Sequence, residues 1–283
     1  MSRLSRRDFL KLALAMVGAA GGLPYYMRHV EPFWPEVRRF RLPLRGLPEA
    51  FRGFRLVHVS DWHIDDEWRS PAPAERWIDL ILAQKPHAVA VTGDWITNEP
   101  DFAMFRRLGP ALRRMAEQVS DGVFFVLGNH DHWANPVFVR ESLTHLGLID
   151  LKNTAVVLQV QRARLALAGV DDPWSKRADW QAAHQAVPEG VPAILLAHEP
   201  DFADETRRWP RFVLQLSGHS HGGQVCLPGQ GPLILPKHAH KYPMGLYDLG
   251  SLKLYTNRGL GVVPPKIRLF CRPEITVLTL EPE

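Results

Sequence analysis

The chain has 283 residues, of which 46% are hydrophobic and 23% are charged, and its formal net charge is +4. This composition excludes a disordered protein and favours a globular fold with a sizeable core. The first eleven residues carry four basic side chains and one acidic one, so they supply +3 of the +4 and leave +1 for the remainder. Nucleic acid is therefore disfavoured as a specific partner, because a nucleic-acid-binding domain carries a basic stripe.

Two cysteines, Cys226 and Cys271, are too few for a disulfide framework or a thiolate metal site. The sequence leaves open whether they pair. It leaves the oligomeric state open as well.

The first 27 residues resemble a twin-arginine export signal. Arg6 and Arg7 precede an uncharged, apolar stretch over residues 12–23. The resemblance implies passage through the twin-arginine translocase to the periplasm, the cell envelope or the inner membrane. The alternative is a short amphipathic first helix. The stretch is shorter than the roughly 20 residues that span a bilayer comfortably. A cleaved form and a retained, membrane-associated form both stay open.

Residues 24–48 are rich in proline, arginine and aromatic side chains, which indicates an extended connector and an edge strand. We therefore divide the chain into a signal or anchor segment (1–27), a connector with an edge strand (28–53) and one domain (54–283). From residue 54, apolar strands over 54–60, 87–92 and 123–127 alternate with helices over 74–84, 101–118 and 136–146. Three such units in succession favour a mainly parallel sheet.

Short strands predominate after residue 149. We predict a hairpin over 155–161 and 164–170, then strands over 191–197, 212–217, 245–249, 253–256 and 275–280, with a long loop over 227–242. A βα half followed by a β-rich half predicts an α/β fold. Its architecture is a four-layer αββα sandwich, in which two mixed β-sheets pack face to face between outer helices.

Five of the predicted strand ends are followed by side chains that bind metals or transfer protons: Asp61 and His63; Asp94; Asn129, His130 and Asp131; His198; and His219 and His221. Open α/β sheets place their ligand sites at the carboxyl ends of strands, so we expect one site assembled from five loops. Asp61 and His63 are two residues apart at a strand end and would point to the same side. Each residue alone has a structural explanation, such as a helix cap for Asp94 or a turn for Asn129. Together they are improbable as unrelated structural residues.

The segments Asp61-Trp-His63, Gly93-Asp94, Gly128-Asn129-His130-Asp131, His198 and Gly218-His219-Ser220-His221 resemble the five signatures of the calcineurin-like metallophosphoesterases. The resemblance covers residues 54 to about 223, and the tail from Gly245 is similar to the exported YkuE/YaeI-type branch. It implies that Asp61, His63 and His221 hold one divalent metal ion and that Asn129, His198 and His219 hold a second, with Asp94 bridging the two. Mixed carboxylate and imidazole ligands favour Mn, Fe or Zn.

The activity that the resemblance implies is hydrolysis of phosphodiester or pyrophosphate bonds by a hydroxide that bridges the two metals. His130 would donate to a phosphate oxygen or protonate the leaving group as a general acid, and Asp131 would orient its ring. A histidine that merely packs beside the ligands is the alternative for His130. The other functions that stay open are a broad phosphomonoesterase or nuclease and an exported metal-binding protein without turnover.

The resemblance also suggests a lipid-linked substrate of the UDP-2,3-diacylglucosamine type. Trp62, Trp95 and Trp133 each adjoin a ligand motif. They would either receive an apolar part of the substrate or pack behind the ligands. The residues alone do not decide between these roles, nor do they identify the substrate or the native metal pair.

Overall fold

The computed structural model describes residues 21–283 except for 65–71 and 99–101. The paired arginines Arg6 and Arg7 lie outside the described residues. Residues 21–29 form a helix that leads into a short 3₁₀ turn, η1 (Glu31–Phe33). The expectation of an extended connector from residue 24 was therefore wrong for this part. Pro24 lies within this helix.

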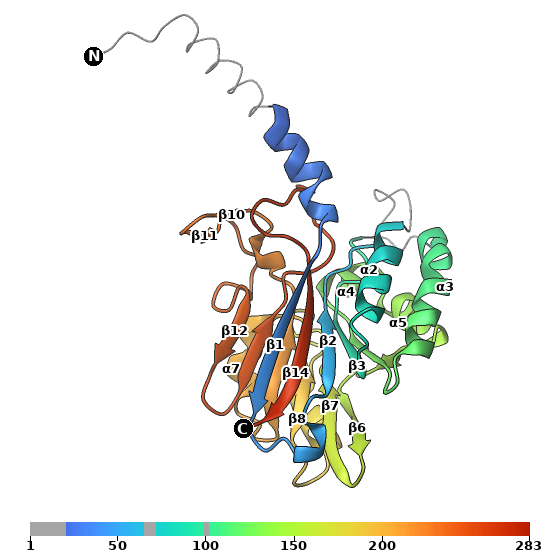
Figure 1. The fold of residues 1–283 in the computed structure, drawn as a ribbon, viewed down its shortest axis with the longest axis vertical. Coiled ribbons are helices and arrows are strands. Elements are labelled where there is room, and N and C mark those ends of the chain that lie inside the picture. The colour runs from blue at the N-terminus through green and yellow to red at the C-terminus, as the bar shows by residue number, and fades with distance from the viewer. Residues whose placement is uncertain (1–20, 65–71, 99–101) are drawn as a thin grey trace, which may run out of the picture.

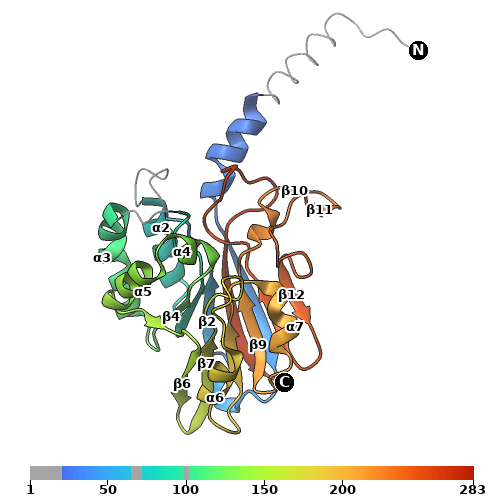
Figure 2. The same ribbon diagram turned by 180° about the vertical axis from the view of Figure 1, so that it is seen from behind.

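Two six-stranded sheets pack against each other (Figures 1 and 2). The first has the order β1 (Glu36–Leu44), β14 (Glu274–Pro282), β2 (Arg55–Val59), β3 (Ala88–Thr92), β4 (Val123–Val126) and β5 (Ile149–Asp150). The second has the order β12 (Gly245–Asp248), β13 (Lys253–Thr256), β9 (Phe212–Ser217), β8 (Ala193–Leu196), β7 (Ala163–Gly169) and β6 (Thr154–Val160). Both contain parallel and antiparallel pairs, so both are mixed as predicted.

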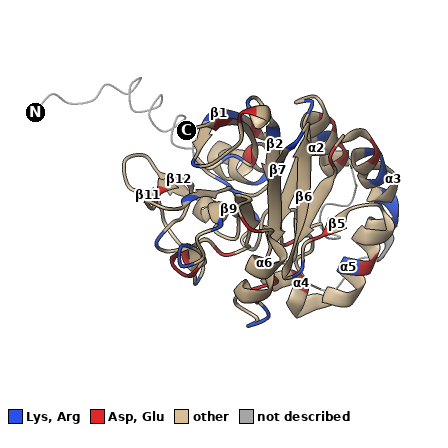
Figure 3. Cartoon of the chain, turned by 90° about the horizontal axis from the view of Figure 1, so that it is seen from below, with Lys and Arg blue, Asp and Glu red and all other residues tan. Residues whose placement is uncertain are grey.

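Helices cover the outer faces of the two sheets. The first sheet carries α2 (Ala72–Leu82), α3 (Phe102–Gln118) and α5 (Pro136–His145), and the second carries α6 (Trp180–Ala186) and α7 (Ala203–Thr206). Charged side chains gather on α2, α3 and α5, whereas the strands between the layers show few (Figure 3). This is the predicted αββα sandwich. None of the helices in the described residues is long and apolar enough to cross a membrane.

Three apolar clusters fill the spaces between the four layers, and β3 shows how one strand serves two of them. Val89 and Val91 pack with the outer helices, whereas Ala88 and Ala90 face the second sheet. Successive side chains of a strand point to opposite faces, so a strand buried on both sides is apolar throughout. The carboxyl ends of β2, β3, β4, β8 and β9 meet at one edge, where the polar side chains begin.

The smaller elements lie mostly in the connections. They are α4 (Asn129–Ala134), the short pair β10 (Cys226–Leu227) and β11 (Gly231–Pro232), and the 3₁₀ turns η2 (Glu49–Phe51), η4 (Pro200–Phe202) and η5 (His221–Gly223). The helix α4 was not predicted. It places Asn129 and His130 on a helical turn, where a loop was expected.

Candidate metal centre

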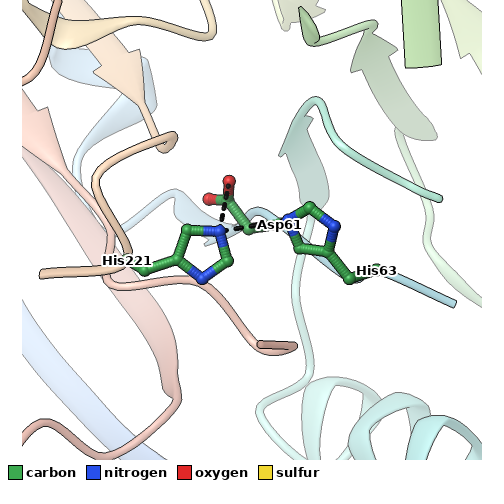
Figure 4. Close-up of side chains that lie close together, drawn as sticks. All are labelled: Asp61, His63 and His221. Carbon is green, nitrogen blue, oxygen red and sulfur yellow. Dashed lines mark hydrogen bonds and ion pairs between the residues drawn. The ribbon is translucent and has the colours of Figure 1, made fainter. Parts of the chain in front are cut away.

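The loop after β2 and the loop after β9 form a first cluster of Asp61, His63 and His221 (Figure 4). The Nε2 atoms of His63 and His221 are 3.0 Å apart, and His221 Nε2 is 3.4 Å from Asp61 Oδ1. All three side chains are buried. Two imidazoles and a carboxylate converging on one point make the donor set of a divalent transition metal ion.

Asp94, His198 and His219 form a second cluster beside the first. His198 Nε2 lies 3.0 Å from Asp94 Oδ2, and the ring centres of His198 and His219 are 4.9 Å apart. The other ring nitrogen of each histidine is bound to a backbone carbonyl. His198 Nδ1 donates to Thr92 O at 2.6 Å, and His219 Nε2 donates to Lys237 O at 2.8 Å. These bonds orient both rings and leave His198 Nε2 and His219 Nδ1 as the ring nitrogens that can bind a metal ion.

Asp94 connects the two clusters. Its Oδ2 atom is 3.0 Å from His198 Nε2 in one cluster and 3.7 Å from His63 Nε2 in the other. Asp61 makes a second connection, because both of its oxygens accept a hydrogen bond from His219 N. Each cluster thus combines residues from both sheets, and neither can form until the sheets have packed together.

The electrostatics of the clusters suit cations. Burial lowers the pKa of His63 and of His219 to about 3, so both rings are neutral and can act as ligands. Burial also opposes charge on His198, but Asp94 and Asp61 overcome it and raise the pKa of His198 above its usual range. The two carboxylates therefore stabilise one positive charge in the site, where burial alone would disfavour a charge.

Five of the cluster residues adopt left-handed backbone angles: Asp61 (φ 51°), His63 (φ 46°), Asp94 (φ 53°), His219 (φ 67°) and His221 (φ 50°). Such angles cost side-chain-bearing residues on the order of 1–3 kcal/mol each and gather at functional sites. The expected strand geometry of Asp61 and His63 was therefore wrong. Their side chains converge because the backbone turns sharply at each residue, and not because side chains alternate along a pleated strand.

Glycine is required where the loops approach most closely. A Cβ atom on Gly128 would lie 2.3 Å from Asp94 Oδ1 and 2.7 Å from His198 Nε2. One on Gly218 would lie 2.4 Å from Asp61 Oδ2. Any side chain at either position would displace a cluster residue, which explains the glycines next to the ligand motifs.

Asn129 supplies an independent test of whether the residues fit metal ions. Its side chain is buried, yet Asn129 Oδ1 has no hydrogen-bond partner among the described residues. A buried amide oxygen without a partner costs about 1–3 kcal/mol, so such atoms are rare unless they bind a ligand. Together with the imidazoles and carboxylates of the two clusters, this oxygen fits a binuclear site.

The sequence comparisons agree with this geometry. A model of the family "Calcineurin-like phosphoesterase" matches residues 54–223. The chain belongs to this family. It is 35% identical to the uncharacterized metallophosphoesterase YkuE of Bacillus subtilis over 99% of both chains. It is 31% identical to the phosphodiesterase YaeI of Escherichia coli, over 98% of this chain and 99% of that one. The chain is accordingly a metallophosphoesterase, which is a hydrolase.

Solved structures with a similar chain path include TT1561 of Thermus thermophilus, with a TM-score of 0.46 at 16% identity over 73% of this chain and 89% of that one. A dimetal phosphatase from Danio rerio has a TM-score of 0.43 at 14% identity over 76% of this chain and 90% of that one.

His130 of this metallophosphoesterase stands beside both clusters without joining either. Its Nδ1 atom donates to Thr97 O at 2.5 Å, and its ring centre is 5.0 Å from that of His63. Its backbone N–H donates to Asp94 Oδ1 at 2.9 Å. The ring is thus fixed by a carbonyl through its Nδ1 atom.

Asp131 does not orient the ring of His130, so this expectation was wrong. Asp131 Oδ1 accepts from Trp95 N and Ile96 N, and Oδ2 accepts from Gly128 N. The carboxylate satisfies backbone donors at the start of α4 and ties that helix to the loop after β3. Its role is to hold the loops of the metallophosphoesterase site in register.

The tryptophans beside the ligand motifs divide between two roles. Trp62 and Trp95 are fully buried and stack on each other with ring centres 5.3 Å apart, so they pack behind the ligands. Trp133 is 57% exposed and lies 5.2 Å from Trp174, measured between ring centres. Trp174, which the sequence patterns did not single out, also lies 5.5 Å from the ring of His219.

An apolar cavity of about 470 Å³ opens beside the clusters of the metallophosphoesterase. Trp133 and Trp174 line it together with Asn129, His130 and His219, and its far side is made of aliphatic residues from the segments 233–236 and 263–267 and from the helix over 21–29. The pocket therefore joins a polar, ligand-rich end to a mostly apolar one.

Arg268 is a second residue that the sequence patterns did not single out. It is fully buried, and its guanidinium donates to the carbonyl oxygens of His221, Cys271 and Gly261. Gly261 N in turn donates to Asp61 O at 2.7 Å. Arg268 thus links the C-terminal segment to the backbone of two residues in the first cluster. It gives no distinct signal in the sequence, because it stands between two other basic residues, Lys266 and Arg272, in a loop without a recognisable motif.

Proposed function

We propose that this metallophosphoesterase is a binuclear enzyme that hydrolyses phosphodiester or pyrophosphate bonds. The observation that carries the proposal is the position of Asp94, whose Oδ2 atom is within 3.7 Å of a donor nitrogen in each cluster. A carboxylate in that position suits two cations held side by side, on the order of 4 Å apart.

The residues fit two metal sites with one shared ligand: Asp61, His63 and His221 for the first ion, Asn129, His198 and His219 for the second, and Asp94 for both. Nitrogen and oxygen donors together favour Mn, Fe or Zn. When bound, two such ions lower the pKa of water and neutralise the charge of a phosphoryl group.

His130 acts on the substrate in this scheme. Thr97 O holds its Nδ1 proton, and its ring lines the pocket beside Asn129 and His219. Its Nε2 atom is then available to donate to a phosphate oxygen or to the departing oxygen as a general acid, which contributes about 10²–10⁴-fold to a rate.

The finer proposal for the substrate is a phosphoester or pyrophosphate linked to a lipid, such as a UDP-2,3-diacylglucosamine-type compound. The apolar part of the cavity supports it, because a chain of methylene groups gains about 0.8 kcal/mol per buried CH₂. A charged head at the clusters and an apolar tail along residues 233–236 and 263–267 would use both ends of the pocket.

The export proposal concerns the first residues of the chain. Arg6 and Arg7 followed by an apolar stretch favour passage through the twin-arginine translocase, with the folded domain in the periplasm or at the inner membrane. Replacing both arginines by lysine should leave the protein in the cytoplasmic fraction. Export of that variant at the wild-type level would exclude this route.

The activity is tested with bis-p-nitrophenyl phosphate after the purified protein has been refilled with Mn²⁺. We expect hydrolysis by the wild type, and a loss of about 10²–10⁴-fold in kcat for His130→Ala with an unchanged metal content. His145→Ala, an exposed histidine on α5, is the matched control and should keep its rate. Full metal content without hydrolysis of diesters, pyrophosphates or monoesters would instead identify a metal-binding protein.

A further inference from the structure

Five apolar side chains are exposed on the segments that line or directly adjoin the pocket. We call this surface the apolar rim and define it by Leu23, Tyr25, Leu233, Ile234 and Phe270, which are between 46% and 79% exposed. Removing such a side chain from water is favourable. A group of them at one place therefore favours contact with an apolar partner.

The rim comes from three segments that are far apart in the sequence and adjacent in space. Arg268 N donates to Met27 O at 2.9 Å, which ties the helix over 21–29 to the C-terminal loop. Met27, Ile234 and Ile267 line the same cavity. Figures 1 and 2 show that this helix leaves the molecule at the same end as β10 and β11. The rim is therefore one continuous end of the molecule.

Two features of the chain favour a lipid bilayer as the partner. The first is the segment that leads into the rim, because residues 12–23 are uncharged and apolar and follow Arg6, Arg7 and Lys11. This segment continues directly into the helix that carries Leu23 and Tyr25. An apolar segment with basic residues on one side partitions into membranes, which favours a bilayer as the surface next to the rim.

The second feature is the chemistry of the rim. Basic and aromatic side chains border its aliphatic residues: Arg28 Nη1 donates to Lys266 O, and the Arg272 guanidinium lies 4.1 Å from the centre of the Trp34 ring. Aromatic rings and basic groups around an apolar surface are typical of the headgroup region of a membrane, where cations attract anionic lipids.

We propose that the apolar rim inserts into the headgroup region of a bilayer and that the pocket of the enzyme opens onto the lipid. This proposal rests on the phosphoesterase function proposed above and names the source of its substrate. A lipid-linked phosphoester would enter between residues 233–236 and 263–267 with its tail still in the membrane. Its phosphate would then reach the clusters without the tail crossing water.

The experiment places an environment-sensitive fluorophore on the full chain at Phe270→Cys, which lies outside the helix over 21–29, and at Leu246→Cys as a matched control. Leu246 is 48% exposed on the edge strand β12, and the native thiols Cys226 and Cys271 are buried. The labelled proteins are mixed with phosphatidylcholine vesicles containing phosphatidylglycerol. We expect a blue shift and quenching by lipid-borne quenchers at position 270 and neither at position 246.

A second measurement uses sedimentation with the same vesicles. Tyr25→Asp/Phe270→Asp should lower the partition coefficient by on the order of 100-fold, because two apolar contacts are replaced by charges that anionic lipids repel. Leu246→Asp should leave it unchanged. Hydrolysis of bis-p-nitrophenyl phosphate without vesicles should be the same in all three proteins, since none of these residues lines the pocket.

The outcomes separate the two proposals. Vesicle binding without any change of the label at position 270 would mean that the first residues anchor the chain alone, and the rim proposal would fall. Self-association reported by that label in place of lipid contact would also overturn it. A chain that binds vesicles through the rim and hydrolyses no phosphoester would leave the rim proposal intact and remove the proposed function.

Discussion

The two clusters contain the same kinds of donor but are held in different ways. In the second, His198 and His219 each donate to a backbone carbonyl, at 2.6 and 2.8 Å. In the first, His63 Nδ1 has a threonine hydroxyl, Thr97 Oγ1, at 3.2 Å, and His221 Nδ1 is buried without a hydrogen-bond partner among the described residues. Partners of this kind orient a ligand and typically change metal affinity by 10–100-fold. The second site is therefore the better organised, and we expect it to bind its ion more tightly.

Removing Asp94, the residue that the clusters share, should abolish the difference in metal affinity between the two sites. Asp94→Ala takes away a carboxylate that contacts both. We expect both sites to lose metal and the hydrolysis of bis-p-nitrophenyl phosphate to fall by more than about 100-fold. Losing a residue that only supports a metal ligand typically lowers metal affinity or activity by at most about this factor. Metal content by mass spectrometry and kcat/KM check this. Two ions retained at full occupancy would show that Asp94 does not bridge.

Removing one ligand from each cluster in turn should show directly which site binds its ion more tightly. His221→Ala removes a donor from the first cluster, and His198→Ala removes one from the second. After dialysis against a weak chelator we expect about one ion per chain in the former, because the carbonyl-supported site survives, and less in the latter. Equal metal content in the two variants would contradict the ranking.

Weakening a partner of the first cluster should have a smaller effect. Thr97→Val removes the hydroxyl near His63 Nδ1 but keeps the carbonyl that holds His130. We expect the affinity of one ion to fall by about 10-fold while the other is unaffected. Thr144→Val, whose hydroxyl donates to Arg140 O on the surface of α5, is the control and should change neither.

The smallest effect should come from the support beneath α4, the helix that carries Asn129. Asp171 accepts hydrogen bonds from His132 on that helix and from Arg140, and Lys152 is also near it. These partners overcome the effect of burial and hold the pKa of Asp171 below its usual range. Asp171→Ala should lower the free energy of unfolding at pH 7 by about 2 kcal/mol.

The pH dependence of that difference has a definite sign. A carboxyl with a lowered pKa in the folded state stabilises the protein above its unfolded pKa, near 3.9, and loses this contribution as the pH falls through the folded value. The difference in melting temperature between wild type and Asp171→Ala should thus be constant from pH 7 to about 5 and shrink below 4. A difference that grows on acidification would mean that Asp171 is not held as an anion.

Most of the framework could be predicted because it depends on local patterns. The strand over 212–217 and the helix over 101–118 came within one residue of β9 and α3, since apolar runs and helical spacing determine such elements. The strand ends that carry Asp61, Asp94, His198 and His219 meet as expected, because parallel strands bring their carboxyl ends to one edge.

The features that could not be predicted from the sequence depend on contacts between distant segments. The helix α4 is stabilised by bonds from Asp131 to the loop after β3, which no local pattern encodes. The stacking of Trp62 on Trp95 and the position of Trp174 beside His219 likewise exist only in the folded chain. The metal ligation itself stays a prediction, supported by the two clusters and by the buried, unpartnered oxygen of Asn129.

The contacts of Arg268 set an order of events in folding. The guanidinium donates to His221 O and to Gly261 O, and Gly261 N donates to Asp61 O, so a segment that follows every candidate ligand in the chain holds two backbones of the first cluster. The first cluster is therefore complete only after this late segment has docked beside it. We expect the ion of the first cluster to bind after the ion of the second during refolding.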